Sequence, residues 1–150
     1  MNPPCRHLLL VLGDQLDIDS SVFDGLDPAL DAVLMIEAFE ESTHVWSHKA
    51  RTALFLSAMR HFAGQLRQRG LTVHYRALEH EGDPTLADGL RAAVQALQPA
   101  CVIGVEPGDL RVRAQIEKAC KPDQCERTPL EWREDKHFLC SLPAFRQWAG

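Results

Sequence analysis

Side chains that could bind a ligand are concentrated between Glu37 and Lys49. Three carboxylates, two histidines and a lysine lie within these thirteen residues. They directly follow Ala32–Ile36, an apolar run without alternation that is typical of a strand buried on both faces of a parallel sheet. Ligands of open α/β sheets bind beyond the carboxyl ends of the strands, so a binding site is predicted here.

Two more apolar runs, His7–Leu12 and Cys101–Val105, end in residues that could complete this site. Glycine permits close approach to the backbone, carboxylates accept hydrogen bonds, and glutamine can donate or accept them. A neutral heterocycle with NH groups or a polyol chain suits this set, whereas clustered carboxylates would repel a phosphate. The candidate binding residues are Leu12, Gly13, Asp14, Gln15, Ile36, Glu37, Phe39, Glu106 and Pro107.

Other chemistries have weaker support in the sequence. His44 and His48 are four residues apart and, with a nearby glutamate, could hold zinc, but no spacing fixes a third ligand. The alternative is that His48 and Lys49 begin a helix and pair with Glu40 or Glu41. No Gly-rich dinucleotide or P-loop fingerprint is present. The five cysteines lack a Cys-x2-Cys pair and are expected to be reduced thiols rather than metal or cluster ligands.

Alternating strand and helix patterns must position these residues. Strands are predicted over 7–12, 32–36, 71–78, 101–105 and 124–128, and helices over about 48–69, 84–98, 109–120 and 141–150. A short helical turn is expected near Pro28. The long helix is expected to have Ser47 or Thr43 as its N-cap and to end at Gly70. A stripe of Phe55, Met59, Phe62 and Leu66 should face the sheet.

This alternation predicts a single α/β domain with a Rossmann-like, doubly wound parallel sheet of five strands. Right-handed crossovers leave few topologies, and we expect strand order 3-2-1-4-5 with helices on both faces. The sequence ends abruptly after Trp148, so residues 1–150 are expected to be one domain of a longer protein.

Composition and charge limit the partners of this domain. Hydrophobic residues make up 45% and charged residues 25%, which is typical of a folded rather than a disordered chain. No apolar run is long enough for a membrane span or a secretory signal, so we expect a cytoplasmic protein. Between Arg6 and Lys49 there are nine acidic residues and no lysine or arginine, and the net charge is −5. Such a surface would repel nucleic acid.

Several segments together resemble one protein family. They are Leu12–Leu16, Glu37 with 41–45, Ser47–Lys49, Leu54–Ala63 and the Gly70-x-x-Val-x-Tyr75 pattern. These residues are similar to the N-terminal domain of bacterial cryptochrome/photolyase-related proteins, in the branch that carries an iron–sulfur cluster.

The resemblance implies a light-harvesting antenna domain that binds 6,7-dimethyl-8-ribityllumazine. It also implies an absent helical domain that holds FAD and a 4Fe-4S cluster, docks DNA and carries the lyase activity, so this chain alone should not repair DNA. In this scheme Gly13, Asp14 and Gln15 would line the ring or ribityl chain, Glu37 would accept a hydrogen bond, and Glu106 would close the far side.

Two other kinds of function stay open for this domain. The first is a ligand-free docking module that positions the parent protein and exposes an apolar patch. The second is an enzyme that uses the acidic crevice with a divalent metal, which would stabilise the fold on binding.

Overall fold

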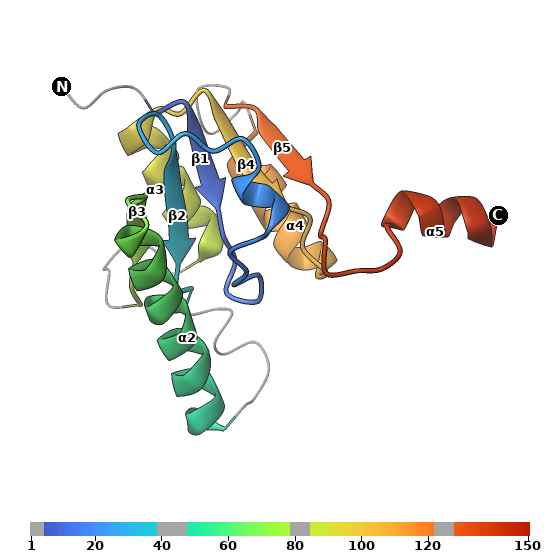
Figure 1. Ribbon diagram of the computed structural model, residues 1–150, viewed down its shortest axis with the longest axis horizontal. Helices are drawn as coiled ribbons and strands as arrows, with labels where there is room; N and C mark the ends of the chain where they lie inside the picture. The colour runs from blue at the N-terminus through green and yellow to red at the C-terminus, as the bar shows by residue number, and fades with distance from the viewer. Residues whose placement is uncertain (1–4, 39–47, 79–84, 122–127) are drawn as a thin grey trace.

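The fold is a five-stranded, all-parallel sheet between two layers of helices (Figure 1). The computed structural model describes residues 5–38, 48–78, 85–121 and 128–150. The strand order is β3-β2-β1-β4-β5, which confirms the predicted topology. The strands are β1 (His7–Leu10), β2 (Ala32–Ile36), β3 (Thr72–Arg76), β4 (Cys101–Val105) and β5 (Leu130–Arg133).

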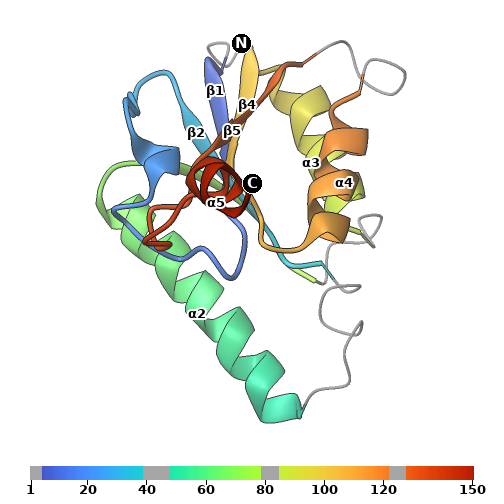
Figure 2. The same ribbon diagram turned by 90° about the vertical axis from the view of Figure 1, so that its right-hand side faces the viewer.

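Helices cover both faces of the sheet, as Figure 2 shows. The long helix α2 (Lys49–Gln68) and the 3-10 helix η1 (Ser21–Phe23) pack on one face. Helices α3 (Leu86–Leu97) and α4 (Leu110–Ala119) pack on the other. The last helix, α5 (Leu142–Ala149), extends away from the sheet in Figure 1.

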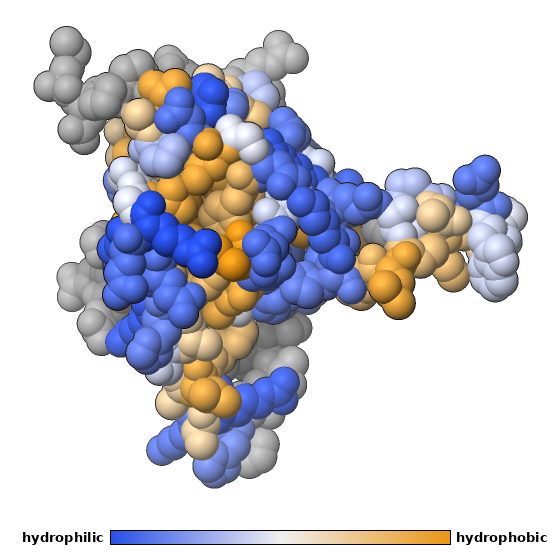
Figure 3. All heavy atoms as spheres, viewed as in Figure 1, coloured by the Kyte–Doolittle hydropathy of each residue, from blue (hydrophilic) through white to orange (hydrophobic). Residues whose placement is uncertain are grey.

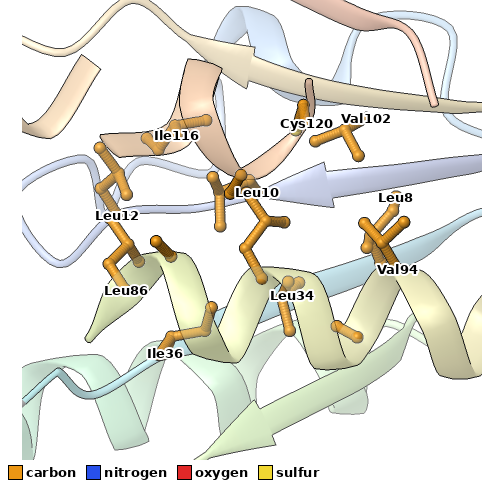
Figure 4. Close-up of a cluster of buried hydrophobic side chains, with 14 of the residues drawn as sticks. Leu8, Leu10, Leu12, Leu34, Ile36, Leu86, Val94, Val102, Ile116 and Cys120 are labelled. Atoms are coloured by element: carbon orange, nitrogen blue, oxygen red, sulfur yellow. The ribbon is translucent and has the colours of Figure 1, made fainter. Parts of the chain in front are cut away.

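The central strands are apolar because both of their faces are buried. In β1, Leu8 and Leu10 point to the α3–α4 side, whereas Leu9 points to the α2 side. Leu34 of β2 joins the first cluster, shown in Figure 4, and Met35 joins the second. A continuous apolar run therefore fills two separate cores, as expected for a covered parallel sheet.

The helix ends follow local rules. The N-cap of α2 is His48, whose Nδ1 accepts a hydrogen bond from the amide of Ala50 at 3.2 Å; the predicted caps Ser47 and Thr43 lie outside the described residues. Gly70 has a φ of 83°, which confirms its predicted role at the end of α2. The N-cap of α4 is Asp109, also as predicted.

Two local predictions need correction, and a third is confirmed. The fifth strand is Leu130–Arg133, not 124–128; its pairing begins where the carbonyl of Pro129 accepts from the amide of Val102, and 124–127 lie outside the described residues. Phe55 does not join Met59, Phe62 and Leu66 in the core between α2 and the sheet, and it is 42% exposed. The helical turn expected near Pro28 is present at residues 28–30, where the amide of Asp31 donates to the carbonyl of Asp27 at 2.8 Å, and a separate 3-10 helix lies earlier, at Ser21–Phe23.

Apolar side chains are exposed over α5 and the segment leading to it, where Figure 3 shows hydrophobic residues at the surface. Phe138 is 68%, Phe145 51% and Trp148 82% exposed, and the rings of Phe145 and Trp148 lie 5.9 Å apart. Side chains of this kind are seldom left uncovered together, which distinguishes this segment from the rest of the surface.

Gly104, the next-to-last residue of β4, offers a direct test of how closely this strand packs against a side chain of β5. A Cβ at this position would lie 3.0 Å from Cζ3 of Trp132 on the neighbouring strand. We expect Gly104→Val to lower the free energy of unfolding by about 2 kcal/mol through overpacking, measured by urea denaturation followed by circular dichroism.

Gly64 provides the matched control. It lies within α2, and a Cβ there would meet nothing within 4 Å. Gly64→Ala should raise the free energy of unfolding by up to about 1 kcal/mol, because alanine favours the helical backbone. A Gly104→Val protein as stable as the unmodified chain would contradict this account of the β4–β5 pair.

Candidate functional site

A cavity of about 250 Å³ lies where β1, β2 and β4 reach their carboxyl ends, between α2 on one side and the first turns of α3 and α4 on the other. Side chains from both layers therefore converge on it. Leu12, Ile36 and Leu86 lie toward the same end of the core cluster in Figure 4. The lining residues are Leu12, Gly13, Asp14, Ile36, Glu37, Ala38, Phe55, Leu56, Met59, Leu86, Pro107, Asp109 and Val112.

The walls of the cavity are apolar on both sides. Leu56 and Met59 contribute from α2, and Leu86 and Val112 contribute from α3 and α4. Met59 is only 2% exposed and Leu86 only 4% exposed, so these walls are held by the two hydrophobic cores. Two apolar walls facing each other favour a flat, uncharged group between them.

Glu37 is the most constrained polar residue of the site. Its side chain is fully buried and accepts hydrogen bonds from both Nε (2.7 Å) and Nη2 (2.9 Å) of Arg60, which form a bidentate pair with it. It also accepts the hydroxyl of Tyr75 at 2.5 Å and the backbone amide of Leu78 at 3.0 Å. The carboxylate thereby joins the end of β2 to α2 and to the chain leaving β3.

This network sets the charge state of its members. Burial alone would raise the pKa of Glu37, but the hydrogen bonds from Arg60, Tyr75 and the Leu78 amide outweigh it and hold the pKa below its ordinary value. Burial and the hydrogen bond to Glu37 raise the pKa of Tyr75. Glu37 is therefore ionised and Tyr75 neutral at neutral pH.

Two other carboxylates lie at the cavity with more solvent around them. Asp14 follows β1 and is exposed. Asp109 is the N-cap of α4, and its side chain is 53% exposed. The amide of Arg111 donates to Asp109 at 2.7 Å and is the main reason that its pKa is lowered. Both residues can accept hydrogen bonds from a ligand with hydroxyl or NH groups.

The structure brings six of the nine predicted residues to the cavity lining, and two of the others turn elsewhere. Gln15 is buried, and its Nε2 donates to the carbonyl of Val105 at 3.3 Å. Glu106 pairs with Arg113 and does not line the cavity. Phe39 lies outside the described residues. The six lining residues are Leu12, Gly13, Asp14, Ile36, Glu37 and Pro107.

Sequence reasoning missed most of the apolar wall. The helical spacing of Phe55 and Met59 predicts packing against the sheet and does not indicate a binding site. Leu86 and Val112 gave no signal of their own, because a first-turn apolar residue is ordinary in any helix that packs on a sheet. Asp109 was recognised only as a cap, and its position at the cavity follows from where β4 ends.

The described residues contain neither a metal-binding cluster nor a membrane-spanning helix. Among residues 5–38, 48–78, 85–121 and 128–150, no three His, Cys, Asp or Glu side chains are placed to hold a metal ion together. His44 of the zinc hypothesis lies outside these ranges. Within the same residues, no helix has the length and apolar character needed to cross a bilayer.

Comparison with known proteins agrees with the motifs. The family of deoxyribodipyrimidine photo-lyase-related proteins matches residues 9–150. A "(6-4) photolyase" of Agrobacterium fabrum is 34% identical over 145 residues, which are 96% of this chain. The chain spans 28% of the length of that relative. The family match covers nearly all of the described fold, from the second half of β1 onward, and the chain therefore belongs to the deoxyribodipyrimidine photo-lyase-related protein family.

Proposed function

We propose that this domain harvests light for a longer photolyase-like protein by binding 6,7-dimethyl-8-ribityllumazine in the cavity at the ends of β1, β2 and β4. The observation that carries the proposal is the combination of two apolar walls with carboxylates at their edge. A flat pteridine-like ring suits the walls, and the hydroxyls of a ribityl chain suit the carboxylates.

The residues present fit such a group. None of the lining residues in the described ranges is a lysine, arginine or histidine, so a phosphate-bearing ligand lacks a cationic partner there. Leu56 and Met59 would cover one face of the ring, and Leu86 and Val112 the other. Asp14 and Asp109 would accept hydrogen bonds, whereas Glu37 would shape the cavity, because its oxygens already accept from four donors.

When bound, the lumazine would absorb blue light and pass the excitation to a flavin elsewhere in the protein. The work of this chain is to exclude water from the ring and hold its orientation, since energy transfer depends on a fixed geometry. The buried walls supply the first requirement, and the network around Glu37 supplies the second by joining α2 to the sheet.

The proposal extends to the longer protein. A helical domain would hold FAD and a 4Fe-4S cluster, contact DNA, and carry out light-driven repair or blue-light sensing. The name of the Agrobacterium relative, a "(6-4) photolyase", supports a photolyase, and its greater length leaves room for such a domain. The exposed aromatic residues of α5 favour a second, compatible function, which is docking to that missing part.

A fluorescence titration with the lumazine tests the proposal, with FAD and Mg²⁺ titrated separately. We expect saturable binding of the lumazine alone. Asp14→Asn should weaken it by roughly 10-fold or more, because a hydrogen bond to a charged acceptor is replaced by a weaker one.

Asp19→Asn is the matched control. Asp19 lies in the same loop, is exposed like Asp14 and does not line the cavity, so the same change of charge should leave the affinity unaltered. Equal affinities for the two variants would remove Asp14 from the site. Absence of lumazine binding by the unmodified chain would refute the proposed function of the isolated domain.

A further inference from the structure

Phe55 rests directly on Gly13, at the edge of the cavity. A Cβ built on Gly13 would lie 2.4 Å from Cζ and 2.7 Å from Cε1 of the Phe55 ring, and 2.8 Å from Sδ of Met59. Real Cβ atoms do not approach other atoms so closely. The ring can therefore occupy its place only because residue 13 has no side chain.

The position of Phe55 on α2 makes it the outer boundary of the cavity. Figure 2 shows that the first half of α2 extends past the ends of the strands. Met59, one turn further into the helix, is 2% exposed and belongs to the core, whereas Phe55 is 42% exposed. One side of the ring thus contacts Gly13, in the segment that follows β1, and the rest of it limits the cavity toward solvent.

The size of the cavity makes the position of Phe55 important for which ligands fit. At about 250 Å³, the cavity is slightly smaller than the roughly 300 Å³ at the lower end of ordinary ligand pockets. The opposite walls are buried core residues that cannot retreat without opening the core. Among the described lining residues, Phe55 is the large hydrophobic residue that is exposed, so we expect an additional ring on a ligand to displace it.

We propose that Phe55, seated on Gly13, determines which ring system the cavity accepts, admitting a two-ring heterocycle and rejecting a fused three-ring one that carries the same side chain. This inference rests on the proposed function and adds a selectivity-determining residue to it. Phe55 acts as a positioning residue here, since it selects and orients the ring without taking part in any reaction.

A matched pair of ligands separates ring size from every other variable. 6,7-Dimethyl-8-ribityllumazine and riboflavin share the ribityl chain and differ in having two and three fused rings. The quantity measured is the ratio of their dissociation constants, obtained by fluorescence titration. For the unmodified chain we expect riboflavin to bind at least tenfold more weakly than the lumazine.

Phe55→Ala should reduce this ratio at least fivefold, chiefly through tighter binding of riboflavin. Leu54→Ala is the control, because Leu54 precedes Phe55 on the same helix, is 72% exposed and does not line the cavity. It should leave the ratio unchanged. If Phe55→Ala fails to fold, as judged by circular dichroism, Phe55→Leu provides the same measurement with a smaller change of shape.

The outcomes distinguish this inference from the proposed function. A ratio unaltered by Phe55→Ala and by Phe55→Leu, with lumazine still bound, would overturn the role of Phe55 alone. If the unmodified chain binds neither ligand, the proposed function fails. In that case riboflavin binding gained by Phe55→Ala would still support the size limit, and no gain would overturn it.

Discussion

Replacing Glu37 by alanine is expected to lower the free energy of unfolding by about 3 kcal/mol. The side chain is fully buried and accepts four hydrogen bonds, two of them from Arg60. Alanine would leave the part-buried Tyr75 hydroxyl and Leu78 amide without their acceptor. Urea denaturation at pH 7, followed by circular dichroism, measures the change.

Asp31 provides a matched control at the opposite end of the same strand. It directly precedes β2, its side chain is 1% exposed, and it accepts Nε (2.9 Å) and Nη2 (2.6 Å) of Arg6. The amides of His7 and Asp27 donate to it as well, at 3.1 and 2.8 Å. Two buried carboxylates with similar partners thus bracket one strand, and only Glu37 lies at the cavity.

Asp31→Ala should therefore destabilise the fold by a similar amount without changing the affinity of the folded protein for the lumazine. Glu37→Ala should also weaken that affinity, by at least tenfold, because α2 loses its attachment beside the cavity. A Glu37→Ala protein with an unchanged urea midpoint would show that the network is not a major source of stability. Equal affinities of the two variants would show that Glu37 does not shape the cavity.

The second large effect is loss of stability in acid. Burial raises the pKa of Glu37 and of Asp31, but the hydrogen bonds to each outweigh it, so both pKa values lie below their ordinary ones. A carboxyl group whose pKa is lowered by folding contributes stability that is complete above its unfolded pKa, about 4 for these groups. That contribution is lost as the pH falls through the folded pKa.

The contribution of Glu37 and Asp31 to the free energy of unfolding should accordingly be constant from about pH 7 to pH 5 and decline steeply below about pH 4. Urea midpoints measured at a series of pH values provide the test. Glu37→Gln removes one titrating group and keeps its shape, so its decline in acid should be shallower than that of the unmodified chain. Parallel declines would mean that Glu37 is not linked to acid unfolding.

The sheet could be predicted from the sequence because its signals are local. Uninterrupted apolar runs marked β1, β2 and β4, and the alternation in residues 71–78 marked an edge strand. The last strand was misplaced because Leu130–Arg133 alternates over only four residues and follows a proline. So short an alternation cannot be distinguished from a loop sequence unless the pairing of the strand with β4 is known.

The site was predictable only in part, for a related reason. The rule that strand ends converge identified Gly13, Asp14 and Glu37 as neighbours. It could not identify which donors would satisfy Glu37, since Arg60 and Tyr75 lie 23 and 38 residues further along the chain. It also could not show that Arg113 would pair with Glu106. Side-chain partners at such separations depend on how the helices finally dock.

The strand order also has a consequence for how the chain folds during synthesis. β1 lies at the centre of the sheet and pairs with β4 in the register His7 to Cys101. Translation at about 5–20 residues per second separates the emergence of these two residues by roughly 5–20 s. Throughout that interval one edge of an apolar strand lacks its partner and is open to aggregation. The centre of the sheet is therefore completed only after β4 has been synthesised.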